Sequence, residues 1–135
     1  MKTFIINLGL GNSTWEKVAD KNDRRTSAFI TADHFASLLG IDITHEWAEG
    51  EYEGKPEETM VITVTTPSVG AAYDFATVLA RVFTQQCVAI YDVEAERGDL
   101  VWSSDVDDRP YTFDPSFFIM PTTVRDRITS RLPKA

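Results

Sequence analysis

Four arginines and two tryptophans could together hold a phosphate-bearing ligand such as a nucleotide. A guanidinium group binds a phosphate through two parallel hydrogen bonds, and an indole ring offers a flat face for a base. The six residues are Arg24, Arg25, Arg125, Arg127, Trp15 and Trp102. Because they are scattered along an acidic chain, we expect them to converge only across subunits, so this hypothesis also predicts a homo-oligomer. The alternative is that the arginines are simply solvated.

The second group of candidate residues is acidic. Six glutamates fall between residues 46 and 58, and alternate residues of an extended chain share a side. The residues expected to share one side are Trp47, Glu49, Glu51 and Glu53. They would form a negatively charged surface with an aromatic anchor, suited to a basic protein partner. The alternative is a solvated hairpin tip with Gly50, Gly54 and Pro56 as its turn residues.

Residue types common in enzymes and metal sites are present, but their contexts do not fit those sites. His34 and His45 lie outside any zinc-binding or two-histidine phosphoesterase motif, and Cys87 has no evident basic partner. Gly9–Asn12 has only two of the three glycines of a dinucleotide fingerprint, so turn formation is the simpler explanation. The acidic run 105–108 lacks the glycine and the final glutamate of a calcium loop. We therefore predict no catalytic residue, no metal and no cofactor.

Composition restricts the class of protein. The chain has 135 residues, which indicates a single domain over 1–135, and its net charge of −8 disfavours direct binding to nucleic acid. A single cysteine excludes an internal disulfide and is typical of a reducing compartment. No apolar run approaches the roughly 20 residues of a membrane span. We expect a cytoplasmic protein with no membrane and no nucleic-acid partner.

The stretch 59–94 organises the expected fold. β-Branched residues favour a strand over 59–66, Pro67 should end it, and Ser68 stands at the N-cap of a helix over 69–85. An apolar stripe at helical spacing gives that helix one buried side: Ala72, Phe75, Ala76, Leu79, Val82 and Phe83. The pattern then predicts a buried strand over 87–94, a turn over 96–99 and a hairpin strand over 100–103.

The complete order of elements suggests an architecture. Strands are expected at 3–10, 41–49, 58–66 and 87–94, with helices at 14–22, 32–39 and 69–85. Thr31 would cap the second of these helices and Gly40 would end it. This order predicts an α+β fold of the ferredoxin-like, split-βαβ type, with a general α+β sheet as the alternative. The extra hairpin strand would be followed, over 110–135, by an extended apolar segment and a short basic helix.

Three patches of sequence resemble small accessory proteins of phages and mobile elements, of the anti-defence type. The patches are Asn7–Asn12, Gln85–Ile90 and Tyr111–Phe118. The resemblance covers about a third of the chain and transfers no individual functional residue. It implies a small protein of the host-cell cytoplasm that acts on a host system by stoichiometric binding.

These features together predict a non-enzymatic binding protein. It would sequester a small phosphate-bearing, nucleotide-like ligand through the arginines and tryptophans, or block a basic host protein through the acidic surface. One alternative is a small hydrolase that acts on a nucleotide-like substrate through carboxylates. A second alternative is a purely structural subunit of an oligomer.

Overall fold

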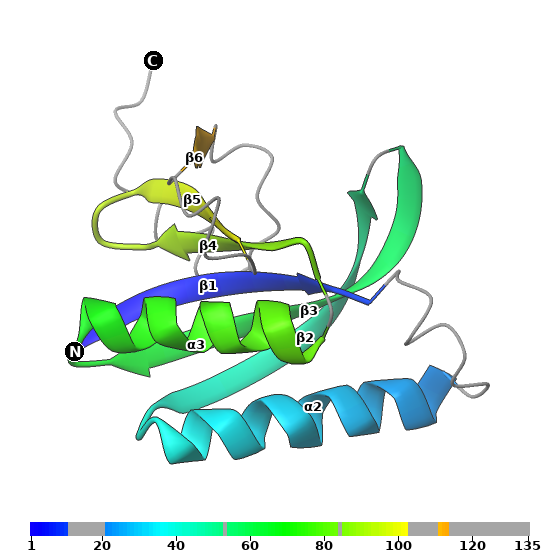
Figure 1. Ribbon diagram of the computed structural model, residues 1–135, viewed down its shortest axis with the longest axis horizontal. Helices are drawn as coiled ribbons and strands as arrows, with labels where there is room; N and C mark the ends of the chain where they lie inside the picture. The colour runs from blue at the N-terminus through cyan, green and yellow to red at the C-terminus, as the bar shows by residue number, and fades with distance from the viewer. Residues whose placement is uncertain (11–20, 53, 84, 103–110, 114–135) are drawn as a thin grey trace.

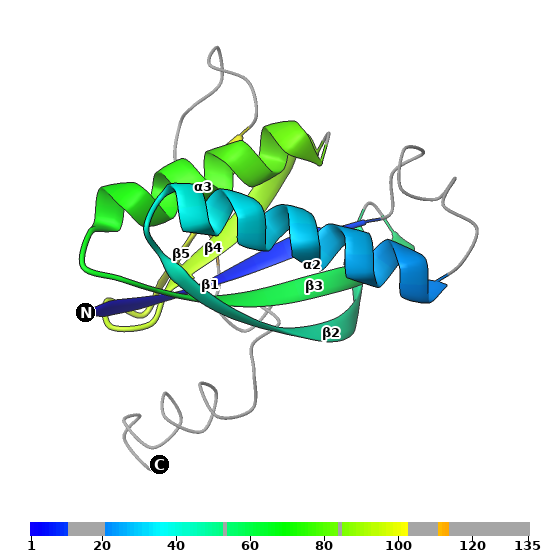
Figure 2. The same ribbon diagram turned by 90° about the horizontal axis from the view of Figure 1, so that it is seen from below.

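The computed structural model describes residues 1–10, 21–52, 54–83, 85–102 and 111–113, which form an antiparallel sheet with two helices on one face (Figure 1). The elements are β1 (Lys2–Gly9), α2 (Lys21–Leu38), β2 (Asp42–Tyr52), β3 (Lys55–Thr66), α3 (Val69–Val82), β4 (Cys87–Asp92), β5 (Arg97–Trp102) and β6 (Tyr111–Phe113). Within these residues the six strands lie in the order β2-β3-β1-β4-β5-β6. Both helices lie in front of the sheet in Figure 2, side by side.

The predicted α+β class is confirmed by this arrangement. Each helix connects two strands that are not neighbours, and β1 lies between β3 and β4, antiparallel to both. The structure adds β5 and β6 beyond β4, and the narrower ferredoxin-like classification stays a prediction.

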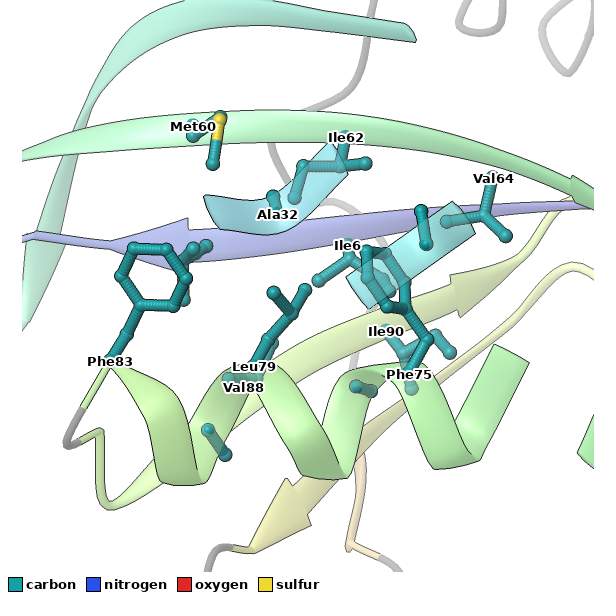
Figure 3. Packing of buried hydrophobic residues seen from close by; sticks show 14 of the residues in the cluster. Ile6, Ala32, Met60, Ile62, Val64, Phe75, Leu79, Phe83, Val88 and Ile90 are labelled. Atoms are coloured by element: carbon teal, nitrogen blue, oxygen red, sulfur yellow. The ribbon is translucent and has the colours of Figure 1, made fainter. Parts of the chain in front are cut away.

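The core lies between the helices and the sheet. Alternate residues of the strands face the helices, among them Ile6 of β1 and Ile62 of β3, both fully buried. Phe75 and Leu79 of α3, and Phe83 directly after it, point toward these strands in Figure 3. The predicted stripe on this helix is therefore buried, although Val82 stays exposed at 38%.

The first helix differs from the prediction. Two short helices at 14–22 and 32–39 were expected, and residues 14–20 lie outside the described residues. From Lys21 the structure has one unbroken helix, α2, which runs to Leu38. Thr31, the predicted N-cap, lies inside it and donates a hydrogen bond from Oγ1 to the carbonyl oxygen of Ser27 at 2.7 Å. The buried residues of α2 are alanines four apart: Ala28, Ala32 and Ala36. These small side chains let α2 approach the sheet along its length, and the helix continues through the predicted break.

The second hairpin also begins earlier than predicted. The turn occupies residues 93–96 instead of 96–99, and β5 starts at Arg97 instead of residue 100. The side chain of Asp92 explains the shift, since it accepts hydrogen bonds at 3.1 Å from the backbone N–H groups of Glu94 and Ala95. Glu96 then takes the left-handed conformation at φ 54°. As a result Asp99 is a buried strand residue and not a turn residue.

Other predicted elements are recovered with shifted ends. Ser68 caps α3, since its side chain accepts a hydrogen bond from the backbone N–H of Ala71 at 3.3 Å. The β2–β3 hairpin turns at Gly54, whose φ is +78°, while Pro56 lies in β3 opposite Glu51. Gly40, at φ +68°, follows the end of α2 as predicted. The predicted helix within 110–135 and most of the apolar segment lie outside the described residues.

Candidate functional site

A cavity of about 780 Å³ lies beside the end of β1, between the β2–β3 hairpin and the start of β4. Its charged and polar lining consists of Asn7, Glu49, Glu51, Glu57, Thr59, Gln85 and Gln86. The other described lining residues are Gly9, Gly50, Pro56, Cys87, Ala89 and Leu100. Five strands, β1 to β5, and the segment before β4 therefore contribute to one pocket.

The unequal lengths of the strands create this pocket. β1 ends at Gly9 opposite Thr59, and one further backbone hydrogen bond of 2.8 Å joins Leu10 N–H to Glu58. Beyond that point β3 pairs only with β2, as far as the Tyr52–Lys55 pair. Figure 1 shows the free part of this hairpin curving past the end of β1, to the side away from the helices. The curved hairpin therefore forms one wall, and the ends of β1, β4 and β5 form the floor.

The pocket is negatively charged. Three glutamates are among the lining residues, Glu49 and Glu51 on β2 and Glu57 on β3, and no lysine or arginine lines the pocket among the described residues. Burial and then the charge of Glu57 raise the pKa of the Cys87 thiol above its ordinary range. The thiol is half-buried at the start of β4, so it is protonated at neutral pH. The site is therefore suited to a positive ligand group and not to thiolate chemistry.

The described arginine candidates lie away from this pocket. Arg25, on α2, forms an ion pair with Glu58, with 3.0 Å between Nε and Oε1, and its guanidinium lies 4.9 Å from the ring centre of Trp47. Arg24 is half-buried on the same helix. Trp102 ends β5 opposite Cys87 but does not line the cavity. Arg125, Arg127 and Trp15 lie outside the described residues, so their proposed roles stay predictions.

The residues of the predicted acidic surface lie along β2. The unbroken β2–β3 register pairs Trp47 with Met60 and Glu49 with Glu58, which keeps Trp47, Glu49 and Glu51 on one face of the strand. Trp47 packs against the core, and Glu49 and Glu51 are among the residues that line the pocket. The ring of His45 lies 6.1 Å from that of Trp47 and is stacked on Phe29 at 4.1 Å. Burial lowers the pKa of His45. Glu53 lies outside the described residues, so the partner-binding role of the set stays a prediction.

Of the pocket residues, only Glu49 and Glu51 were selected from the sequence; the others include Asn7, Gly9, Glu57 and Thr59. Glu57 was one of six glutamates with nothing to distinguish it. Asn7 carried the clearest signal, since it is the polar residue within the apolar stretch 4–10, and it lies opposite both Val61 and Ala89. The other residues become significant only when the strand register is known.

A second polar group lies between α3 and β5. The hydroxyl of Tyr73 donates a hydrogen bond to Oδ2 of Asp99, which is only 3% exposed. The other oxygen, Oδ1, has no hydrogen-bond partner within the described structure, and Arg97 Nε lies 3.9 Å from it. Burial raises the pKa of Tyr73, and its hydrogen bond to Asp99 and the negative charge of Asp99 raise it further. These residues do not line the pocket, and their contacts join the helix to the sheet.

The described residues include no cluster of three or more His, Cys, Asp or Glu side chains that could hold a metal ion. None of the described helices is long and apolar enough to cross a membrane.

Comparison with known proteins finds no matching family and no matching curated protein. Two solved structures of a phage SAM lyase are weakly similar. The apo structure shares 13% sequence identity at a TM-score of 0.44, over 87% of this chain and 92% of that chain. The complex with S-methyl-5'-thioadenosine shares 12% identity at a TM-score of 0.38, over the same shares of the two chains. These are phage proteins, the class that the sequence patches resemble, but similarity of this size carries no argument about function.

Proposed function

We propose that this chain is a non-enzymatic protein that binds a small organic cation in the pocket. The main support is that three glutamates, Glu49, Glu51 and Glu57, are among the lining residues and that the described lining includes no lysine or arginine. A recess lined by one sign of charge concentrates ions of the opposite sign. An ammonium, guanidinium or sulfonium group on the ligand would meet these carboxylates.

The ligand should also have an uncharged body. A volume of about 780 Å³ lies within the range of pockets for small molecules and cofactors. Ala89 and Leu100 supply apolar contact, while Asn7 and Thr59 supply hydrogen-bonding groups. A nucleoside with a positive charge combines these needs, since it has a flat ring, hydroxyl groups and a cation. S-Adenosylmethionine is such a compound, and we choose it as a probe on these grounds.

Calorimetric titration with a matched pair of ligands tests the proposal. S-Adenosylmethionine has a sulfonium, whereas S-adenosylhomocysteine lacks one methyl group and that charge. We expect the cation to bind at least about tenfold tighter, which is about 1.4 kcal/mol. The preference should fall when Glu57→Gln removes a carboxylate from the pocket. Glu46→Gln is the control, because Glu46 is an exposed residue of β2 outside the pocket.

Two outcomes would contradict the cation proposal. One is equal affinity for the two ligands, and the other is a preference that Glu57→Gln leaves unchanged. Agmatine, a guanidinium compound with no nucleoside, extends the panel to a cation of different shape. ATP tests the phosphate-bearing ligand predicted from the arginines, and tighter binding of ATP than of either cation would favour that hypothesis.

A second candidate function is the blocking of a basic protein by the acidic surface. Its support is that Glu49 and Glu51 are exposed while they also line the pocket. Replacing both by lysine, together with Glu53, should abolish binding of a lysine-rich peptide in a fluorescence anisotropy titration. An affinity unchanged by the three replacements would remove this candidate.

The remaining expectations are part of the same proposal. We infer a phage-type, cytoplasmic protein that sequesters its ligand as a homo-oligomer, with a ferredoxin-like sheet as its scaffold. Native mass spectrometry before and after denaturation would measure the subunit number and any retained ligand. Intact recovery of the ligand favours sequestration, whereas a converted ligand favours the hydrolase alternative. A protein that binds none of the probes would favour the structural-subunit alternative.

A further inference from the structure

The carboxylate of Glu57 occupies the space where residue 9 would otherwise have a side chain. A Cβ atom built on Gly9 would stand within 2.7 Å of all three atoms of that carboxylate group. Cβ atoms essentially never approach other heavy atoms closer than 3.0 Å. The described glycines with positive φ are Gly40 and Gly54. The presence of a glycine at position 9 is therefore explained by its lack of a side chain and not by an unusual backbone conformation.

The strand register produces this close approach. Gly9 pairs with Thr59 in the last pair between β1 and β3. Glu57 comes two residues before Thr59, so its side chain leaves β3 on the same face and reaches diagonally across Gly9. Continuing the β1–β4 register past the Asn7–Ala89 pair places Cys87 on the far side of Gly9. Glu57 thus reaches over β1 toward β4, on the floor of the pocket.

We propose that Gly9 is a positioning residue, which holds the Glu57 carboxylate over the pocket floor and so sets the preference of the site for a cation. The effect of Gly9 on ligand preference rests on the proposed function, whereas its effect on the position of the carboxylate rests on the geometry alone. A methyl group on Gly9 would stand between β3 and β4 and push the carboxylate back toward β3. Because a carboxylate is the flexible end of its side chain, the fold should accommodate this change.

The single thiol of the chain reports the carboxylate position without any ligand. The charge of Glu57 contributes to the raised pKa of Cys87, and the chain has one cysteine. The rate of alkylation by iodoacetamide as a function of pH therefore measures one titration. Gly9→Ala and Glu57→Gln should both shift this titration to lower pH, since each weakens the negative field at the sulfur. Glu49 and Glu51 also line the pocket, and they stay unchanged in both variants.

A double-mutant cycle separates positioning from general effects. If Gly9 acts through Glu57, Gly9→Ala should have no further effect on the thiol titration once Glu57→Gln is present. Gly70→Ala is the matched control, because a Cβ there makes only an ordinary 3.5 Å contact with the Ser68 hydroxyl. Glu57→Asp provides a second test that adds no atom at Gly9. Its shorter side chain draws the carboxylate back, so it should lower the pH of the thiol titration as well.

Ligand titration completes the experiment. Gly9→Ala should weaken S-adenosylmethionine binding by about tenfold while it leaves S-adenosylhomocysteine binding within about twofold. One result would overturn the positioning role: Glu57→Gln shifts the thiol titration, whereas Gly9→Ala and Glu57→Asp leave it unchanged. Shifts in all three variants, with no cation bound by the wild type, would support the positioning role and overturn the proposed function. The two ideas therefore fail in different ways.

Discussion

Tyr73→Phe should destabilise the protein, because it removes the hydrogen bond of a buried carboxylate. Asp99 has a side chain only 4% exposed, and the Tyr73 hydroxyl is the donor to its Oδ2 atom. Its other oxygen has no hydrogen bond within the described structure. The Nε atom of Arg97 lies 3.9 Å from Oδ1 of Asp99, on a side chain that is 62% exposed, so solvent screens that ion pair. The substitution therefore leaves the carboxylate without a compensating hydrogen bond.

The expected cost follows from the charge and burial of the acceptor. A hydrogen bond to a charged group contributes about 1.5–3 kcal/mol, and leaving a buried group unsatisfied costs a similar amount. We expect a loss of about 2 kcal/mol, measured by urea denaturation. Phenylalanine keeps the edge-to-face contact with Phe4, whose ring centre lies 6.5 Å from that of Tyr73. Packing should therefore change little, and the loss reports the hydroxyl.

Asp99→Ala is the background that tests this explanation. Without the carboxylate, Tyr73→Phe should cost less than about 0.5 kcal/mol, so the two substitutions should be coupled by more than about 1 kcal/mol. A cost below about 0.5 kcal/mol in the wild-type chain would show that the hydroxyl does not stabilise Asp99. A full cost in the Asp99→Ala background would show that Tyr73 acts through another contact. Either result would refute the reasoning.

The same hydrogen bond predicts the pH dependence. Burial is the largest cause of the raised pKa of Tyr73, followed by its hydrogen bond to Asp99 and the negative charge of Asp99. The charge of Arg97 lowers this pKa, and the charge of Asp92 raises it. A raised pKa in the folded state means that folding favours the protonated hydroxyl. The stability difference between wild type and Tyr73→Phe should be constant from about pH 6 to 9 and decline above about pH 10, where unfolded tyrosine ionises. A difference that grows above pH 10 would contradict the sign.

Two further substitutions test the packing of α3. Leu79→Ala removes a fully buried side chain of the core and should cost about 2–5 kcal/mol in urea denaturation, whereas Val82→Ala, at 38% exposure, should cost well under half as much. Equal costs would show that the helix is rotated relative to the described core. Ser68→Ala removes the N-cap hydrogen bond and should lower stability by about 1 kcal/mol, measured by thermal denaturation. An unchanged melting temperature would contradict the capping role.

The elements around α3 were predictable because their signals are local. Pro67 ends a strand and Ser68 begins a helix within two residues, and the apolar stripe that follows has strong contrast between its two sides. The first helix has little such contrast, because its buried positions are alanines and exposed Ile30 and Leu38 lie elsewhere on it. Its continuity depends on packing against the sheet, and packing cannot be deduced from a pattern of small residues. Asp99 was predicted to lie in a turn because it follows a glycine, and both residue types are common in turns.

The candidate site was less predictable than the fold, because it depends on pairings between distant segments. Glu57, Gly9 and Cys87 come from three strands, and each is ambiguous by itself. The sequence motif around Gly9 suggested turn chemistry, but Gly9 is the last paired residue of β1. The space of a side chain at position 9 is occupied by a carboxylate 48 positions away in the chain, brought across β1 by the β1–β3 register. A one-residue change of that register would turn Glu57 to the opposite face of the sheet and remove the contact. The register of β1 and β3 is therefore the feature on which both the fold and the proposed charge of the pocket depend.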